Sequence, residues 1–305
     1  MFYFQLMGCK CQRESTSTSN EIRTLSLPHG GRQIHQFPSP KIKSVEDALT
    51  LLSPTGITKG LTPTSRKDTE GEDPVTVELQ DGAIYQGDWR EGKRNGKGRQ
   101  VWPDSTFYEG DWKDDMPNGE GKKILPNGLI IEGTFSDGKA EGTCVLRNKE
   151  GLRIQGIFKN DLPFGPCFAK YPDRSEYEGD MVGLLREGKG RLSKTDGSTY
   201  EGEFKNDLRE GNGTLTWVDG RRYEGQWVAD KMQGVGEHRW ADGSVYKGGY
   251  HNDLKHGEGE FTWPNGKCFK GTWICGMREG IGIMIQTNGN QQKGLWNNDK
   301  RVKWL

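Results

Sequence analysis

The chain has 305 residues, and only 31% of them are apolar, although 45 glycines bring the combined fraction close to that of globular domains. Lys plus Arg equals Asp plus Glu at 43 each, which excludes a global electrostatic attraction to nucleic acid or to an anionic membrane. The six cysteines include no CxxC pair and are too sparse for a disulfide-stapled scaffold. We therefore expect a cytoplasmic protein that binds no nucleic acid.

The first segment, residues 1–74, contains no repeat and is rich in Ser, Thr and Pro. This composition predicts a mostly disordered tail. One stretch, "SVEDALTLLSP", predicts a short helix over 44–53, because Ser44 can cap it and Pro54 would end it. The alternative is an unfolded tail with weak helicity.

The sequence "MGCKCQ" at Met7 suggests a lipidation site. Translation from Met7 would expose Gly8 for myristoylation, with Cys9 and Cys11 beside it for palmitoylation, and two lipids together give stable anchoring. Against this, six residues precede Met7, and Gln12 stands where the acylation motif prefers Ser or Thr. The opening residues are also too few for a membrane span and lack the features of a signal peptide.

From Val75 to the C-terminus the sequence repeats every 23 residues without insertion or deletion. Each unit opens with a large residue, a glycine two positions later and a second large residue two positions after that. A G-x-G cluster and a "PNG" or "DG" turn follow. Nine full repeats begin at residues 85, 108, 131, 154, 177, 200, 223, 246 and 269, with a partial one at 292 and a capping half-repeat at 75–82. The first glycines, predicted to be structural, are Gly87, Gly110, Gly133, Gly156, Gly179, Gly202, Gly225, Gly248, Gly271 and Gly294.

Each repeat predicts two strands joined by a six-residue loop, and a short turn then leads to the next hairpin. The fold class predicted is all-β, an elongated single-layer antiparallel sheet of tandem hairpins. In this register the aromatic residue at position five lies over glycines of neighbouring strands. The pairs predicted within one repeat are Phe204 with Gly211, Gly202 with Gly213, and Tyr200 with Leu215. Those predicted between repeats are Trp217 with Tyr223, and Gly213 with Trp227.

The pattern Y-x-G-x-[WF], G-x-G and a closing glycine resembles the MORN (membrane occupation and recognition nexus) repeat family, and the resemblance covers 75–305. It implies a non-catalytic scaffold that links protein partners to a membrane, the cytoskeleton or a cilium. It also implies phospholipid binding as an alternative, in which the ribbon itself tethers the protein to a membrane. A third alternative is a regulatory subunit of a separate enzyme. The repeat pattern sets no oligomeric state.

Four tryptophans share one position at the end of the second strand, where they predict a partner-binding stripe: Trp102, Trp217, Trp240 and Trp263. Exposed aromatic side chains are favoured anchors at protein interfaces. The alternative is that these rings simply cover the sheet.

Two repeats depart from the consensus, those that begin at Ile131 and Ile154. Both have Ile in place of Tyr, and Cys144 and Cys167 replace the second glycine of their G-x-G clusters. Sequence drift in a tolerant array explains these changes, and a specialised bend or partner site is the alternative.

The sequence contains no recognisable catalytic constellation. It has no P-loop, no G-x-S-x-G, no H-E-x-x-H and no dinucleotide fingerprint at a strand-to-helix turn. The glycines follow the 23-residue period, so they do not indicate phosphate loops. We therefore predict no enzyme activity, no cofactor and no metal site.

Overall fold

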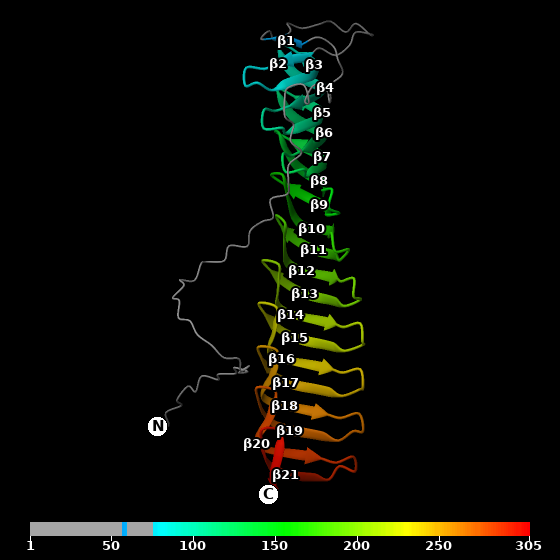
Figure 1. The fold of residues 1–305 in the computed structure, drawn as a ribbon, viewed down its shortest axis with the longest axis vertical. Coiled ribbons are helices and arrows are strands. Elements are labelled where there is room, and N and C mark those ends of the chain that lie inside the picture. The colour runs from blue at the N-terminus through cyan, green and yellow to red at the C-terminus, as the bar shows by residue number, and fades with distance from the viewer. Residues whose placement is uncertain (1–56, 60–75) are drawn as a thin grey trace, which may run out of the picture.

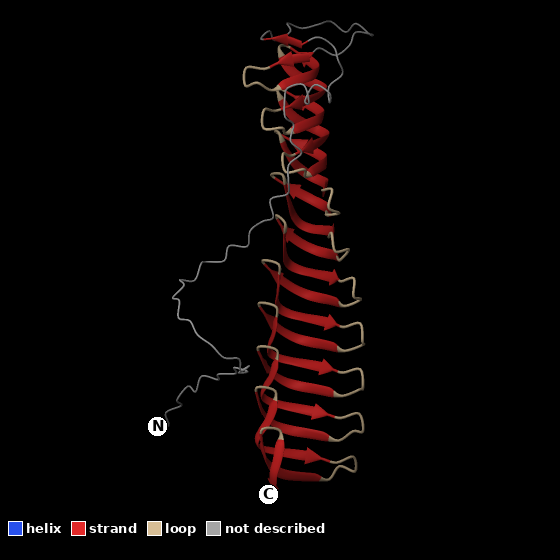
Figure 2. Ribbon diagram, viewed as in Figure 1, coloured by secondary structure: helices blue, strands red, loops and turns tan. Residues whose placement is uncertain are grey.

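The computed structural model describes residues 57–59 and 76–305, which form one open sheet of 22 strands (Figures 1 and 2). All regular structure in these residues is strand. The predicted tail and its helix over 44–53 lie outside the described residues, apart from β1. The strands are β1 Ile57–Lys59, β2 Thr76–Glu78, β3 Ile84–Arg90, β4 Lys93–Val101, β5 Phe107–Lys113, β6 Met116–Ile124, β7 Ile130–Ser136, β8 Lys139–Arg147, β9 Arg153–Lys159, β10 Leu162–Lys170, β11 Glu176–Val182, β12 Leu185–Ser193, β13 Thr199–Lys205, β14 Leu208–Thr216, β15 Arg222–Val228, β16 Lys231–Arg239, β17 Val245–His251, β18 Leu254–Thr262, β19 Cys268–Ile274, β20 Met277–Ile285, β21 Gln291–Asn297 and β22 Lys300–Trp304.

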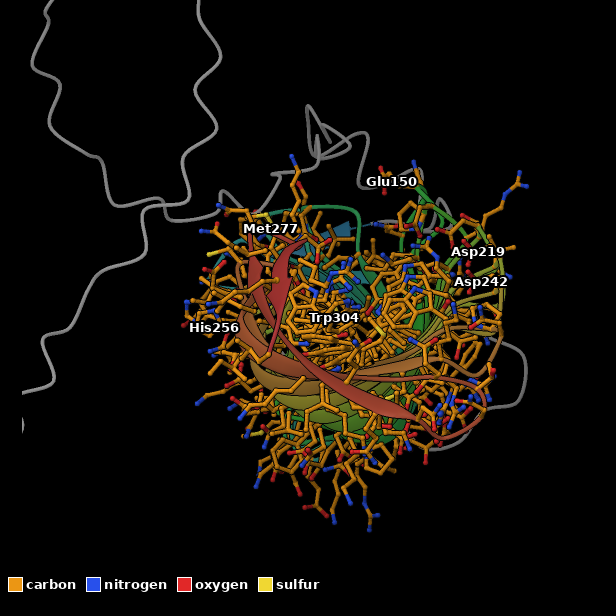
Figure 3. All side chains as sticks on the ribbon, turned by 90° about the horizontal axis from the view of Figure 1, so that it is seen from below. Glu150, Asp219, Asp242, His256, Met277 and Trp304 are labelled. Carbon is orange, nitrogen blue, oxygen red and sulfur yellow. The ribbon has the colours of Figure 1, made fainter. Side chains whose placement is uncertain are left out.

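The sheet is a long curved ribbon with a filled inner side. Consecutive strands from β2 to β22 pair antiparallel, so the described chain advances along one axis (Figure 1). Viewed along that axis, the sheet curls around its side chains, with Trp304 on the inner side (Figure 3). Met277 and His256 lie near one margin, and Asp219 and Asp242 lie near the other. The sheet therefore has a concave face, which holds the core, and an outer face.

The first edge of the sheet carries a short cap. β2 pairs antiparallel with β3, which confirms the half-repeat expected at 75–82, and β1 adds a parallel strand beside β2. An added strand occupies hydrogen-bonding groups that would otherwise form an open edge.

Within a repeat the two strands are joined by a two-residue turn instead of the predicted six-residue loop. Asn206 and Asp207 form this turn with φ of 49° and 71°, the left-handed geometry that suits the twist of a hairpin. The predicted pairs Gly202 with Gly213 and Tyr200 with Leu215 are confirmed, whereas the pair Phe204 with Gly211 is wrong, since Phe204 pairs with Arg209.

A β-bulge causes this difference. The register shifts between Gly202 and Glu203, because Gly211 and Asn212 are extra residues on the opposite strand. Gly211 has a φ of +62°, a conformation that side chains with a Cβ rarely adopt. The first glycine of each G-x-G cluster therefore forms the bulge, and the strands continue past it to a tight turn.

Between repeats the predicted register is wrong by two residues. The chain reverses in a five-residue turn, in which Trp217 N donates to Arg221 O at 2.9 Å and Gly220 N donates to Trp217 O at 3.0 Å. This turn is centred one residue earlier than the sequence suggested. The observed pairs are Leu215 with Tyr223, Gly213 with Gly225, and Gly211 with Trp227.

The paired glycines form the seat of the tyrosine at position one, and not of the aromatic ring at position five as predicted. A Cβ on Gly213 would lie 2.2 Å from Tyr200 Oη, and a Cβ on Gly202 would lie 2.5 Å from the Cα of Gly213. The Tyr200 ring lies along its own strand, and its hydroxyl donates to the carbonyl of Glu203 at 3.1 Å. Two adjacent strands therefore carry glycine because a flat ring covers both backbones.

The position-five rings pack edge-on against these tyrosines. Tyr200 contacts Phe204 of its own repeat at 5.1 Å between ring centroids and Trp227 of the next repeat at 5.5 Å, both in T-shaped geometry. Such aromatic pairs contribute about 0.5–1.5 kcal/mol beyond area burial. Because each tyrosine bridges two repeats, the core continues along the concave face.

The two repeats with isoleucine keep the same core by a paired replacement. Ile131 and Ile154 are buried where tyrosine stands elsewhere, and neither reaches over the G-x-G glycine. Cys144 and Cys167 fill that space, and a Cβ on Gly156 would lie 2.5 Å from Cys167 Sγ. The replacements of tyrosine and glycine therefore compensate each other.

Candidate functional site

Five aromatic side chains form a continuous row on the concave side of repeats six to eight. This aromatic ledge consists of Trp217, His238, Trp240, Phe261 and Trp263. His238 stacks between Trp217 and Trp240, at 5.3 and 4.2 Å between centroids and within 9° of parallel. Phe261 continues the row, 5.5 Å from Trp240 and 4.8 Å from Trp263.

The structure brings together three of the four predicted tryptophans. Trp217, Trp240 and Trp263 each begin a five-residue turn after β14, β16 and β18, and all three are partly buried against the core. Trp102 lies in the first repeat, far along the ribbon, and stacks on Trp112 at 6.3 Å. A ledge of partly exposed rings therefore spans three consecutive repeats and does not include Trp102.

Two members of the ledge were missed from the sequence, His238 and Phe261. Each lies directly opposite the position-one tyrosine of its repeat, Tyr223 or Tyr246. Strand alternation from the buried tyrosines places these residues on the concave face, so the period-two pattern of the second strand was the available signal.

His238 is held neutral by its surroundings. Burial lowers its pKa from the ordinary 6.5 to about 4, and the charges of Arg221 and Lys255 act in the same direction, whereas Asp219 opposes them weakly. The ring is only 7% exposed. It therefore stacks in the ledge as an uncharged imidazole near neutral pH.

Acidification is expected to weaken the ledge. Because the folded-state pKa of His238 is depressed, the unfolded chain binds the proton more readily between pH 6.5 and 4. The free energy of unfolding should fall in that window by up to about 1.4 kcal/mol per pH unit and level off below it. Chemical denaturation at a series of pH values measures this slope. His238→Phe, which copies Phe261, should remove this contribution, and an unchanged slope would contradict the assignment.

Lys255 places a positive charge beneath the ledge. Its Nζ lies 4.3 Å from the ring centroid of Trp273, 4.9 Å from Phe261, 5.4 Å from Tyr246 and 5.5 Å from Trp240. Burial lowers the pKa of this amine. The Asp299 carboxylate acts on this pKa in the opposite direction, but within the described part of the chain no carboxylate lies within ion-pairing distance of the Lys255 amine.

Arginines at the same repeat position as Lys255 are neutralised. Arg209 packs over Trp227 at 4.1 Å, and its Nε donates to the Asp230 carboxylate at 3.1 Å while Nη2 donates to the Asp230 carbonyl at 2.8 Å. Asp230 comes from the two-residue turn of the next repeat. Lys255 lacks such a partner because the next turn, at Cys275 and Gly276, contains no aspartate. We call this arrangement, in which an arginine binds the aspartate 21 positions later, a clasp. The same clasp joins Arg94 to Asp115, Arg186 to Asp207, and Arg278 to Asp299.

A hollow of about 920 Å³ extends the concave face beyond the ledge toward the N-terminus. Tyr171, Leu192, Lys194 and Leu215 are among the residues that line it. Lys194 occupies the repeat position that Trp217 holds in the following unit, so an aromatic ring is missing there. Ledge and hollow together offer an elongated surface of aromatic rings and charged side chains, in which Asp173, Asp207 and Asp230 line the hollow beside its cations.

The other predicted site features have different outcomes. The ten first glycines of the repeats lie in strands, whereas Gly8, Cys9 and Cys11 lie outside the described residues. In residues 57–59 and 76–305, no group of three or more His, Cys, Asp and Glu side chains is placed to hold a metal ion. The same residues contain no helix long and apolar enough to cross a membrane.

Solved structures show only a weak overall likeness. The TCP domain of Drosophila melanogaster SAS-4 (dCPAP), in complex with a proline-rich motif of Ana2 (dSTIL), is 14% identical and covers 50% of this chain and 84% of its own, with a TM-score of 0.34. The wild-type TCP10 domain of Danio rerio CPAP is 12% identical and covers 75% and 98%, with a TM-score of 0.37. Likeness at this level supports no statement about function. No curated protein matches the chain.

Family comparison agrees with the observed hairpins. Eight segments match the MORN repeat, and none of them covers 154–176: residues 85–107, 108–130, 132–153, 177–199, 200–221, 223–245, 246–268 and 269–291. These segments make up more than half of the chain and coincide with its strand pairs. The chain therefore belongs to the MORN repeat family.

Proposed function

We propose that this protein is a non-catalytic scaffold that holds a segment of a protein partner along its concave face, with the aromatic ledge as the anchor. The observation that carries the proposal is the continuous aromatic row, in which every ring except His238 is partly exposed, next to a lysine that no aspartate clasps. Partly exposed aromatic rings are frequent binding hot spots. A partner segment with apolar side chains beside a carboxylate would cover the rings and pair with Lys255.

The concave face supplies both the aromatic rings and the positive charge that such a partner segment requires. Trp240 stacks on His238 and Trp263 makes an edge-on contact with Phe261, so both rings are held in place before any partner arrives. Preorganised rings lose little conformational freedom on binding. The clasped arginines present no free charge, so Lys255 is the distinctive cation of the ledge.

Loss of the central ring should reduce binding without unfolding the array. A random peptide library displayed against the immobilised full-length protein should enrich apolar sequences that carry Asp or Glu. Trp240→Ala should weaken the enriched peptides at least about tenfold, because interface tryptophans often contribute more than 1.4 kcal/mol. Fluorescence anisotropy measures the affinity, and thermal unfolding monitors the fold.

Two further variants make this experiment specific. Lys255→Glu should reverse the preference of the library toward basic peptides. Val218→Ala is a matched control, since Val218 is exposed and adjoins Trp217 outside the ledge. The proposal would be contradicted if the enriched peptides showed no preference for acidic residues, or if Trp240→Ala bound them as tightly as the wild type does.

A membrane-binding function predicts a different result. If the ribbon itself tethers the protein to phospholipid, the full chain should float with anionic vesicles, and Trp240→Ala should abolish flotation. We propose instead that membrane, cytoskeletal or ciliary attachment depends on the bound partner or on lipids at Gly8, Cys9 and Cys11. Mass spectrometry of the native N-terminus tests the lipids, and an unmodified terminus that retains Met1 would exclude them.

A further inference from the structure

The outer face of the fourth repeat carries an apolar patch. In β9 and β10, Phe158, Cys167 and Ala169 point into the core, so the alternating residues point outward. Ile157 and Phe168 are two of these, 46% and 40% exposed. We name as the repeat-four patch the outward residues Ile157, Phe164, Pro166 and Phe168.

The same positions are mostly polar in the other repeats. Phe164 is 50% exposed, although hydrophobic side chains of this size normally lie inside. The residues at the position of Phe164 in the other full repeats are Asn95, Asn118, Glu141, Glu187, Glu210, Gln233, His256 and Glu279. At the position of Phe164, an apolar side chain is therefore specific to the repeat at 154–176, the one that no family match covers.

The patch continues into the next strand. Phe164 pairs directly with Val182 of β11, which is 52% exposed; Leu184 in the following turn and Leu185, the first residue of β12, are 41% and 43% exposed. A contiguous group of exposed apolar side chains at one place indicates an interaction surface. An outer sheet face packs readily on another sheet face.

Charges on both sides of the patch indicate what covers it. On one side, β9 presents Arg153 and Lys159 outward, and both are exposed. On the other side, β11 presents Glu176, which pairs with Lys170 at 3.0 Å, and the exposed Glu178. The patch therefore has a basic flank and an acidic flank.

We infer that the repeat-four patch binds a second copy of this chain, with the two ribbons antiparallel and a twofold axis running along β10. A rotation about that axis places β9 of one copy over β11 of the other. Arg153 then faces the Glu176 and Glu178 region of its partner, while the apolar side chains of the two β10 strands pack together. Such a contact uses the same surface on both copies, so the assembly is a closed dimer that adds no further copies.

The alternative twofold arrangement, with parallel ribbons, is disfavoured. It would place β9 over β9 and β11 over β11, so that the basic residues of β9 meet the basic residues of its copy, and the acidic residues of β11 meet those of its copy. Like charges brought together at an interface oppose association. The charge pattern thus selects the antiparallel dimer, which leaves the concave face of each copy free.

Sedimentation equilibrium of the full-length protein across a concentration series tests the inference. The wild type should approach twice its monomer mass of 34.3 kDa. Phe164→Glu should raise the dimer dissociation constant at least about tenfold, because it places two charges in the apolar centre. Glutamate occupies this position in four other repeats, so the fold should tolerate it. Val235→Glu is the matched control on the outer face of repeat seven, where Val235 is 67% exposed, and it should leave the mass unchanged.

A charge exchange tests the orientation. Arg153→Glu and Glu178→Arg should each weaken the dimer, and the double variant should restore it. A monomeric wild type at tens of micromolar, or a dimer that Phe164→Glu leaves intact, would overturn the inference. The inference would also be overturned if the wild type were monomeric and floated with lipid vesicles while Phe164→Glu did not float, since the patch would then face a membrane.

Discussion

Replacing Gly202 with alanine is expected to lower the free energy of unfolding by about 3 kcal/mol or more. The new Cβ would lie 2.5 Å from the Cα of Gly213 and 2.7 Å from the carbonyl oxygen of Asn212. Both are backbone atoms of the paired strand, so the clash cannot be relieved by a side-chain rotation. The Tyr200 hydroxyl lies on the remaining side, 2.6 Å away.

Denaturation in guanidinium measures this loss, and hydrogen exchange should locate it in β13 and β14. Gly220→Ala serves as the control. Gly220 has a φ of +86°, but no atom lies within 4 Å of the position that an added Cβ would take, so its replacement should cost only about 1–2 kcal/mol of backbone strain. Equal effects of the two substitutions would show that the packed ring and strand are not what requires glycine.

Trp227→Ala is expected to cost about 3–5 kcal/mol of unfolding free energy. The side chain is only 2% exposed, and its Nε1 donates to the carbonyl of Gly213 at 3.1 Å. It contacts Tyr200 and Tyr223 edge-on and carries the guanidinium of Arg209 above it. Its removal would therefore break the core contacts between repeats six and seven.

Trp217→Ala provides the comparison for Trp227, because Trp217 is partly buried and lies in the ledge. Urea titration followed by circular dichroism should show a distinctly smaller loss for Trp217. If both variants lose the same stability, the distinction between core tryptophans and ledge tryptophans fails.

Much of the fold could be predicted because the 23-residue period is free of insertions. It specified a meander of hairpins, and the pair Gly202 with Gly213 was predicted correctly, although the pair Phe204 with Gly211 from which it was extended was wrong. The bulge could not be predicted, since a glycine that fills a left-handed position and a glycine that seats a ring look alike in sequence. Gly211 and Gly213 belong to the same G-x-G cluster and have these two different roles.

Less of the candidate site than of the fold could be predicted from the sequence. Trp217, Trp240 and Trp263 were found because they recur at one position. His238 and Phe261 join them as the residues opposite Tyr223 and Tyr246, the same pairing that was predicted correctly for Tyr200 with Leu215, but they differ in kind from repeat to repeat and so form no recurring motif. The unpaired state of Lys255 depends on an aspartate that is missing from the turn of the next repeat, a relationship across 21 residues that no local motif reveals.

The clasps between neighbouring repeats bear on the distance between the aromatic ledge and the repeat-four patch along the ribbon. Each clasp joins an arginine to an aspartate 21 positions later, so the repeats that it joins are tied at the same step of two strands, about 10 Å, by which the pairing of successive hairpins advances the whole array. The ledge and the repeat-four patch are therefore separated by a whole number of such steps. If both surfaces bind as proposed, the array would act as a molecular ruler, in which the number of hairpins between the two surfaces sets how far apart their ligands are held.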